Sequence, residues 1–305
     1  MSDIKEKFQI ISDSSCDLPP ELTVEKNIKV VPFYVSFDDE HYEKEIEEIK
    51  IRDFYQKMVD NPKVFPKTSM PAVQDYIDAF EPYAKDGQAV ICICISTKFS
   101  GSYQSAMTAK EMVLEDYPQA RIAVIDATVN TVLQGIYVLE AVSLRDSGMD
   151  FEAAVERLEE VKSTGRIFFT VGDMEYLKHG GRIGKVAGIA GSVLGIRPVI
   201  VLKEGEIFPA GIGRSRKSTV AKSIDLLLNY LKEEGGGFDR FRLTIGYGYD
   251  YEEAVAIREQ TLSILREKGY EIDEIPLFQI GAAISVHTGP YALGFAIIEK
   301  GLFNS

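Results

Sequence analysis

The sequence predicts an α/β protein with two domains, of which the N-terminal one is built on a parallel sheet. Near-continuous apolar runs, typical of strands buried on both faces, alternate with helical segments through the first half of the chain. The 305 residues are too many for one ordinary core and suit two domains of about 150 residues each. We expect an N-terminal α/β domain at 1–165 and a smaller, two-layer α/β domain at 166–305.

The alternation is clearest in the first of these domains. Apolar runs predict strands, and segments with helical periodicity or an initial proline predict helices. The expected strands span 8–11, 28–35, 89–95 and 121–125. The expected helices begin after Pro19, span 51–59 and 73–83, and carry Ala106 and Ala109.

A helix at 151–162 and a turn at 163–165 predict the domain boundary. Beyond it, strands are expected at 167–171, 198–202, 242–247 and 278–281, and helices at 219–233 and 252–267. These strands are farther apart and less regularly spaced than the earlier ones. The spacing indicates a second layered domain and not a continuation of the first sheet.

The composition narrows the classes of function. A formal net charge of −13 repels phosphate backbones, so nucleic-acid binding is not expected. No stretch approaches the roughly 20 apolar residues that span a bilayer, so stable membrane insertion is not expected either. The charged start leads straight into a strand, which predicts no signal peptide and a cytoplasmic protein.

The cysteines favour a structural role. Three cysteines cannot form a disulfide framework, which suits a reducing cytoplasm. Cys92 and Cys94 alternate within one expected strand and therefore share a face. We expect them in the core, because no histidine lies near them and their spacing does not suit a metal site.

Three hydroxyl-rich segments fall where strands of the parallel sheet are expected to end: 12–15, 67–71 and 96–102. In an open parallel sheet, ligands bind outside the carboxyl ends of the strands. Helix capping is the more common explanation of any one such segment, because Ser, Thr and Asp accept hydrogen bonds from free amides. Three of them in one half of the chain support a polar binding site as well as they support capping.

A glycine-rich segment at 180–195 invites comparison with a phosphate-binding loop, but its spacing is wrong. Three residues instead of four separate Gly180 from Gly184, and Val186 stands where Ser or Thr would hold magnesium. The glycines at 184, 188, 191 and 195 instead predict a backbone surface against which something packs closely. Of the three histidines, His287 precedes Gly-Pro and is expected at a strand end or turn.

Together these segments resemble the DegV family, whose best-understood members are the fatty-acid-binding subunits of bacterial fatty acid kinase. The similarity runs from about residue 10 to residue 297. The motifs that carry it, in order, are Ser-Asp-Ser-Ser-Cys-Asp-Leu-Pro at 12–19, Lys-Thr-Ser-Met-Pro at 67–71, Ser-Gly-Ser-Tyr-Gln-Ser-Ala at 100–106, Glu-Tyr-Leu-Lys-His-Gly-Gly-Arg-Ile at 175–183, Gly-Ile-Arg-Pro at 195–198 and His-Thr-Gly-Pro at 287–290.

The resemblance implies a DegV-like fold with an acyl chain buried between and within two α/β domains. It also implies that Thr68, Ser100 and His287 hold the carboxylate of a long-chain fatty acid such as palmitate, stearate or oleate. A separate kinase subunit brings ATP and magnesium and phosphorylates this acid to an acyl phosphate. The protein itself then needs no cofactor or metal and completes no reaction alone, and the acyl phosphate serves phospholipid synthesis.

Further residues have supporting roles by the same resemblance. The residues expected to shape the pocket and its loops are Asp13, Ser14, Ser69, Gly101, Thr288 and Gly289. Arg182 and Arg214, the latter in the basic cluster at 214–217, are expected to dock the kinase, with surface solubility as the alternative for each.

Several positions differ from the usual family pattern. They are Met70 and Ala72 in place of Gln and Ser, Phe99 in place of Leu, Ser102 in place of Thr, Tyr291 in place of Gly, and the loop at 126–131. The carboxylate-binding residues are retained, so these differences bear on chain-length preference.

We expect hydroxyl groups and no arginine at the carboxylate, because a guanidinium would neutralise the oxygen that must attack the γ-phosphate. His287 would tune the site by protonating near neutral pH, since an ordinary histidine titrates at about 6.5. Two other functions remain open. One is an esterase with Ser100 as nucleophile, His287 as base and Asp13 or Asp126 as orienter, although Ser100 lacks the Gly-x-Ser-x-Gly elbow. The other is a lipid carrier or sensor without a kinase.

Overall fold

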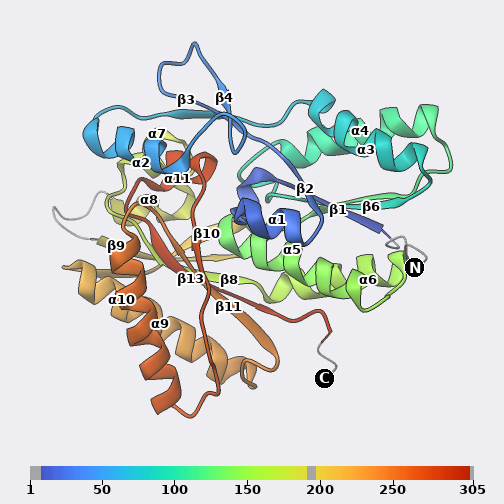
Figure 1. Cartoon of the computed structure of the whole chain (residues 1–305). Coiled ribbons are helices and arrows are strands. Elements are labelled where there is room, and N and C mark those ends of the chain that lie inside the picture. Colours follow the sequence, from blue (N-terminus) through green and yellow to red (C-terminus); the bar gives the residue numbers. More distant parts are fainter. Residues whose placement is uncertain (1–7, 191–196, 303–305) are drawn as a thin grey trace.

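The computed structural model of the protein describes residues 8–190 and 197–302. Two sheets lie one above the other with helices outside and between them, in the order helix, sheet, helix, sheet, helix (Figure 1). This arrangement confirms the predicted α/β class with a parallel sheet in the first half. The division into domains at 1–165 and 166–305 remains a prediction, although the strands of the two large sheets fall on either side of it.

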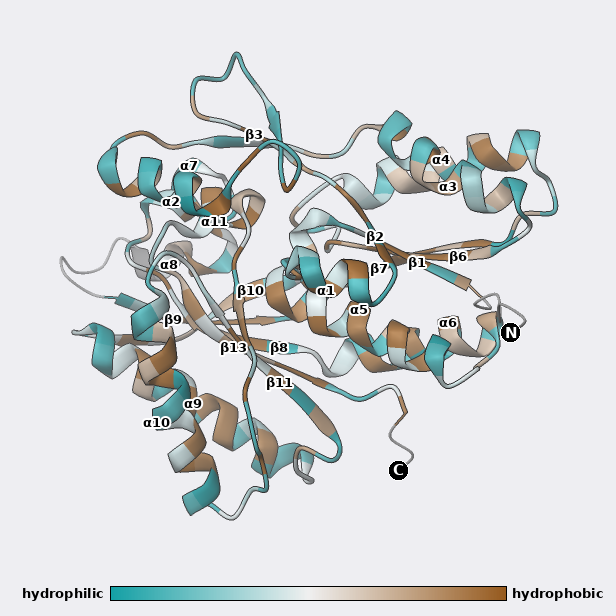
Figure 2. Ribbon diagram, in the orientation of Figure 1, coloured by the Kyte–Doolittle hydropathy of each residue, from teal (hydrophilic) through white to brown (hydrophobic). Residues whose placement is uncertain are grey.

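The first sheet is wholly parallel, with the strand order β2-β1-β6-β7. Its strands are β1 (Phe8–Asp13), β2 (Ile28–Val31), β6 (Ala89–Cys94) and β7 (Ile122–Asp126). Every residue of β1 and β6 is buried, and Figure 2 shows hydrophobic colour along this sheet. Cys92 and Cys94 lie in this core, as predicted, with their Sγ atoms 3.7 Å apart.

The second sheet is mainly antiparallel, with the order β10-β9-β8-β13-β11-β12, and only β11 and β12 run parallel. Its strands are β8 (Arg166–Thr170), β9 (Arg197–Lys203), β10 (Glu206–Gly213), β11 (Phe241–Tyr247), β12 (Leu277–Gln279) and β13 (Leu293–Glu299). Strands β10 and β13 were not expected from the sequence. They supply the neighbours that β8 and β9 need to form a continuous sheet.

Helix α5 (Thr131–Asp146) lies between the two sheets and contacts β1 on one side and β11 and β13 on the other. Most of its residues are buried, including Glu140 and Arg145. Sequence analysis assigned no element here, because a helix covered on several sides lacks the apolar stripe and polar face that reveal a surface helix.

The remaining long helices lie beside α5 or cover the outer faces of the two large sheets (Figure 1). Those of the first half are α1 (Pro20–Glu25), α3 (Val73–Lys85), α4 (Ser102–Asp116) and α6 (Phe151–Val161). Those that cover the second sheet are α9 (Arg216–Glu234) and α10 (Tyr251–Glu267). Among the described helices, none combines the length and apolar character needed to cross a membrane.

A third, small antiparallel sheet has the order β4-β3-β5 and lies beside two helices (Figure 1). It consists of β3 (Tyr34–Ser36), β4 (Glu43–Lys44) and β5 (Lys67–Ser69), and its neighbours are α2 (Ile51–Asp60) and α11 (Ala282–Thr288). The strand predicted at 28–35 is therefore wrong. Pro32 and Phe33 end β2, and β3 belongs to a different sheet.

The predicted close packing on the glycines at 184 and 188 is also wrong. Among the described residues, a Cβ on Gly188 would meet no atom within 4 Å, and one on Gly184 would make only an ordinary contact with Ile207. Gly191 and Gly195 lie outside the described residues. The short elements here are α7 (Glu175–His179) and α8 (Ala187–Ala190), with a 3-10 turn at Gly184–Val186 between them.

Candidate functional site: a cavity between the two large sheets

A cavity of about 330 Å³ lies between the two halves of the chain. Loops that follow β1, β6 and β7 line one side, and residues of β8, β9, β11 and β13 line the other. Its apolar lining includes Phe33, Ile95, Val132, Ile167, Phe169, Leu177, Leu202, Ile207, Ile280, Ile284 and Leu293. Such a volume and lining are typical of a site for a small apolar ligand.

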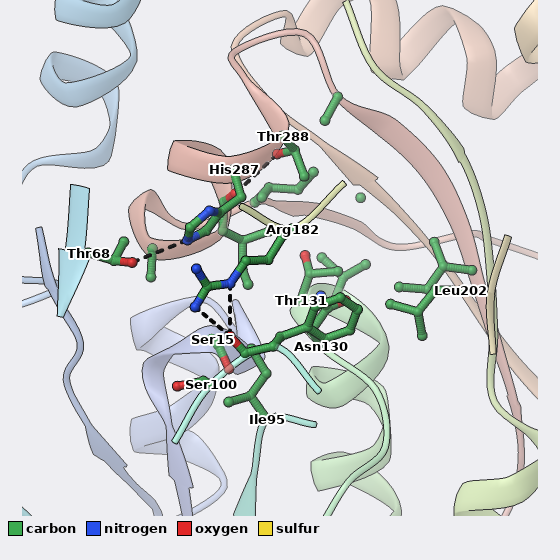
Figure 3. Close-up of a pocket in the computed structure, with 18 of the residues that line it drawn as sticks. Ser15, Thr68, Ile95, Ser100, Asn130, Thr131, Arg182, Leu202, His287 and Thr288 are labelled. Carbon is green, nitrogen blue, oxygen red and sulfur yellow. Dashed lines mark hydrogen bonds between the residues drawn. The ribbon is translucent and has the colours of Figure 1, made fainter. Parts of the chain in front are cut away.

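The predicted carboxylate-binding residues gather at one end of this cavity (Figure 3). The Thr68 hydroxyl and His287 Nε2 are hydrogen-bonded at 3.2 Å, although 219 positions separate them in the chain. Ser100 lines the same cavity, and its Oγ accepts a hydrogen bond from the Ser102 amide at 3.2 Å. The structure thus brings all three residues to one site.

The local structure around two of these residues differs from the prediction. Thr68 does not end a parallel strand but lies in β5, where it pairs with Val35 of β3. His287 lies in the last turn of α11 and not at a strand end. The segments at 12–15 and 96–102 do follow β1 and β6, as expected.

His287 is held in a way that keeps it neutral. Burial and, to a smaller extent, the nearby Arg182 guanidinium lower its pKa to about 4, while the backbone at Gly180 opposes the shift. Its Nδ1 atom has no hydrogen-bond partner of good geometry among the described residues. This lowered pKa contradicts the expectation that His287 protonates near neutral pH.

Arg182 also lies at this end of the cavity, where no arginine was expected (Figure 3). Its Nε and Nη2 donate to the Phe99 carbonyl at 3.0 and 2.8 Å, and its Nη1 donates to the Gly180 carbonyl at 2.7 Å. These bonds fix the guanidinium beside Ser100. The side chain is nevertheless partly open to solvent, so contact with a partner protein is also sterically feasible.

The residues predicted to support the site separate into two groups. Ser69, Gly101 and Thr288 line the cavity, whereas Gly289 lines a smaller neighbouring pocket. Asp13 and Ser14 are buried and do not line it. Sequence analysis missed three polar lining residues, Ser15, Asn130 and Thr131, although Ser15 stood within the motif at 12–19.

The candidate orienters of an esterase triad point elsewhere. The Asp13 carboxylate accepts hydrogen bonds from the Ile95 amide and from the side chains of Ser15, Ser102 and Gln134. Asp126 accepts from Thr97 and from the amide of Thr128. Neither carboxylate is hydrogen-bonded to His287, and His287 is bonded to Thr68, not to Ser100. The described residues therefore do not assemble a nucleophile, base and orienter.

Comparison with protein-family models shows which family this chain belongs to. A family model described as an uncharacterised protein of the DegV family matches residues 7–300. The chain belongs to the DegV family. A DegV domain-containing protein of Clostridium acetobutylicum is 31% identical over 300 residues, which cover 97% of this chain and 99% of that protein.

Solved structures of DegV proteins share the fold over nearly the whole chain. A stearic acid-binding protein from Eubacterium ventriosum is 43% identical, with a TM-score of 0.91 over 96% of this chain and 99% of its own. A fatty-acid-binding DegV family protein from Thermus thermophilus is 30% identical, with a TM-score of 0.85 over 96% of this chain and 99% of its own.

Proposed function

We propose that this protein binds one long-chain fatty acid, with its tail in the apolar cavity and its carboxylate beside Thr68, Ser100 and His287. The observation that carries the proposal is the polarity of the cavity. Apolar side chains line most of its length, and a hydrogen-bonded polar group stands at one end. The stearic acid-binding protein from Eubacterium ventriosum has the same fold, which supports this ligand class.

The tail accounts for most of the affinity. Burial of a methylene contributes roughly 0.8 kcal/mol, so a sixteen-carbon acid gains on the order of 10 kcal/mol. Loss of rotational, translational and chain freedom offsets part of this gain. The head group therefore has only to avoid the penalty of an unpaired buried carboxylate, which is large.

The polar end can satisfy that carboxylate. The hydroxyl proton of Ser100 has no acceptor among the described residues, so it is free to donate to a ligand. A hydrogen bond to a charged group contributes about 1.5–3 kcal/mol. Arg182 adds a positive charge nearby, which stabilises the ionised acid without requiring His287 to be protonated. A bound carboxylate in turn raises the pKa of His287.

Native mass spectrometry of the purified protein tests this proposal. We expect an added mass equal to one fatty acid, which is lost when Thr68→Val and Ser100→Ala are combined. Ser263→Ala, which removes an exposed hydroxyl on α10, serves as a control and retains the acid. A gently purified protein that carries no acid and binds no added stearate would contradict the proposal.

We further propose that a separate ATP-dependent kinase phosphorylates the bound acid to an acyl phosphate. Arg182 is exposed beside the proposed head-group site, and Arg214 is exposed elsewhere in the second half of the chain. Both positions support docking of the kinase. Arg214 makes no hydrogen bond or ion pair with any described residue. Its neighbour Arg216, by contrast, is engaged by Glu253 and is less suited to docking.

Trapping with hydroxylamine tests the kinase step. The lipid-loaded protein, ATP and a cell extract of its source organism should yield a fatty hydroxamate. Arg214→Glu should lower the yield while acid binding is kept, and Lys232→Glu on the exposed face of α9 should not. Acid binding without any hydroxamate would favour a carrier or sensor instead.

A further inference from the structure

Two carboxyl groups are buried together beneath the polar end of the cavity. Asp17 ends the 3-10 turn of Ser14–Cys16, and Glu45 follows β4. Their exposed fractions are 7% and 4%. Neither forms an ion pair with a lysine, arginine or histidine among the described residues, so the burial of these acids requires another explanation.

Gly281 shows how close the two acids are. A Cβ on Gly281 would lie 2.5 Å from Asp17 Oδ1 and 2.6 Å from Glu45 Oε1. The two oxygens are therefore at most about 5 Å apart, the sum of these distances. Only a residue without a side chain fits at this position, which is the N-cap of α11.

All carboxyl oxygens of the pair but one have a donor. Ser14 Oγ donates to Glu45 Oε2 at 2.5 Å, and the Ala283 amide donates to Glu45 Oε1 at 3.0 Å. Thr131 Oγ1 donates to Asp17 Oδ2 at 2.6 Å. Asp17 Oδ1 is buried and has no donor of good hydrogen-bond geometry among the described residues, although the Gly281 amide lies near this carboxylate and favours its ionised form. The unpartnered oxygen is the one that faces Gly281 together with Glu45.

Two ionised carboxylates at this separation and burial repel each other strongly, and such pairs retain a proton. A proton on Asp17 Oδ1 would remove the repulsion and would also give this oxygen a hydrogen-bond acceptor, Glu45 Oε1. We infer that Asp17 and Glu45 share a proton at neutral pH, and that the protonated pair positions α11 and thereby His287.

The other titratable groups around the pair are neutral or independently satisfied. Asp13 lies nearby on β1, where four donors hold its carboxylate. Cys16 is in the same turn, and burial raises its pKa to about 12. Tyr55 of α2 donates to the Ile280 carbonyl, and burial raises its pKa too. Tyr247 of β11 lies beyond Tyr55, and burial raises its pKa as well. None of these groups supplies a positive charge.

The pair is connected to both sides of the cavity. Glu45 holds the first turn of α11 through Ala283, and His287 lies one turn farther along the same short helix. Asp17 holds Thr131, which begins α5 and lines the cavity. Thr131 has a positive φ of 50°, an unfavourable conformation for a β-branched residue, so it depends on such a bond. Loss of the proton keeps both hydrogen bonds but adds repulsion between the two carboxylates, which pushes the two anchors apart.

The pKa of Glu45 places the loss of the shared proton near neutral pH. Burial raises the pKa of Glu45 to about 7, with the Ser14, Ala283 and Ala282 hydrogen bonds opposing the rise. Burial and then the Glu45 charge raise the pKa of Asp17. Because both values are raised, the pair stabilises the fold most at acid pH, and this contribution declines as the pH rises from about 4.5 through 7.

Infrared spectroscopy of the full-length, delipidated protein tests for the shared proton directly. A protonated-carboxyl band should be present at pH 7.5 and absent from Asp17→Asn, whose amide replaces the donor. Glu45→Gln should also lack the band, so the test does not depend on one variant folding. Identical bands in all three proteins would overturn the shared proton.

Stearate affinity measured from pH 6 to pH 9 tests the positioning role, which rests on the proposed function. The wild type should bind stearate about tenfold more weakly when the pair is deprotonated than when it is protonated, a difference that corresponds to a shift of about one pKa unit. Asp17→Asn, which mimics the protonated acid, should bind normally with a flat profile. An equal pH dependence in both proteins would refute the role. Absence of stearate binding at any pH would instead count against the proposed function, and the infrared result would stand.

Discussion

Gly180 and His287 are packed against each other so closely that no other residue fits at position 180. A Cβ on Gly180 would lie under 3 Å from Nδ1 of His287, and its nearest three neighbours would all be atoms of that ring. The glycine-rich segment and the His-Thr-Gly-Pro segment are thus two sides of one site. The Gly180 carbonyl also accepts a hydrogen bond from Arg182, so this glycine connects both residues of the polar end.

Gly180→Ala is expected to displace the His287 ring and to weaken fatty acid binding. The added methyl group overpacks the site, which typically costs about 1–3 kcal/mol of stability. Gly188→Ala, in the same glycine-rich segment, meets no atom of the described part of the chain within 4 Å and serves as the matched control. Thermal denaturation and stearate titration of both variants provide the measurement. Equal behaviour of the two would show that the ring moves aside freely.

Protonation of His287 is expected to destabilise the delipidated protein at acid pH. Its pKa of about 4 in the fold lies below the ordinary 6.5, so the folded state resists protonation. The stability associated with neutral His287 is complete above pH 6.5 and is lost as the pH falls towards 4. The loss amounts to about 3 kcal/mol at most.

Urea unfolding at pH 7 and pH 4.5 measures this loss. His287→Gln should lose less stability between these pH values than the wild type, because glutamine does not titrate. Ser263→Ala, at an exposed hydroxyl of α10, should lose as much stability as the wild type. Bound stearate should reduce the wild-type loss, since its carboxylate favours the charged ring.

Leu202 is expected to limit the length of the bound acid. It is buried, lines the cavity and lies away from Thr68 and His287 (Figure 3). Leu202→Phe should shift preference towards shorter acids, because a larger side chain fills space that the tail end would occupy. Leu202→Met keeps the volume nearly constant and should preserve the wild-type preference. Competition between acids of twelve to eighteen carbons, read by native mass spectrometry, gives the measurement.

Substitutions of Arg182 distinguish a role in binding the carboxylate from a role in docking the kinase. If the guanidinium stabilises the carboxylate, Arg182→Gln should weaken stearate binding about tenfold or more, given about 1.5–3 kcal/mol for a hydrogen bond to a charged group. Arg182→Lys should be intermediate, because lysine keeps the charge but not the planar fork. Undiminished stearate binding with a lower hydroxamate yield would assign Arg182 to docking, as the sequence first suggested.

Much of the fold was predictable where the pattern is local. The continuous apolar runs of β1 and β6 reflect strands covered on both faces, and the hydroxyl-rich segments after them do follow strand ends. Helix α5 escaped prediction because its burial between two sheets removed the polar face on which helix recognition depends.

The site was predictable only in part. Thr68, Ser100 and His287 followed from a resemblance, and the structure places them at one cavity end. Glu45 gave no signal, since it stands in the acidic run at 43–48, which is typical of an exposed surface. Its burial against Asp17 and Gly281 follows from contacts with segments that lie 28 and 236 residues away in the sequence.

The sequence by itself determined the family, the α/β class and the residues at which a polar site was to be sought. Those properties depend on side-chain chemistry and on periodicity, which are local. Tertiary structure decided that His287 is neutral, that Arg182 lies beside Ser100, and that Asp17 faces Glu45. Burial and the distance between charges set these properties, and both depend on which distant segments the fold brings together.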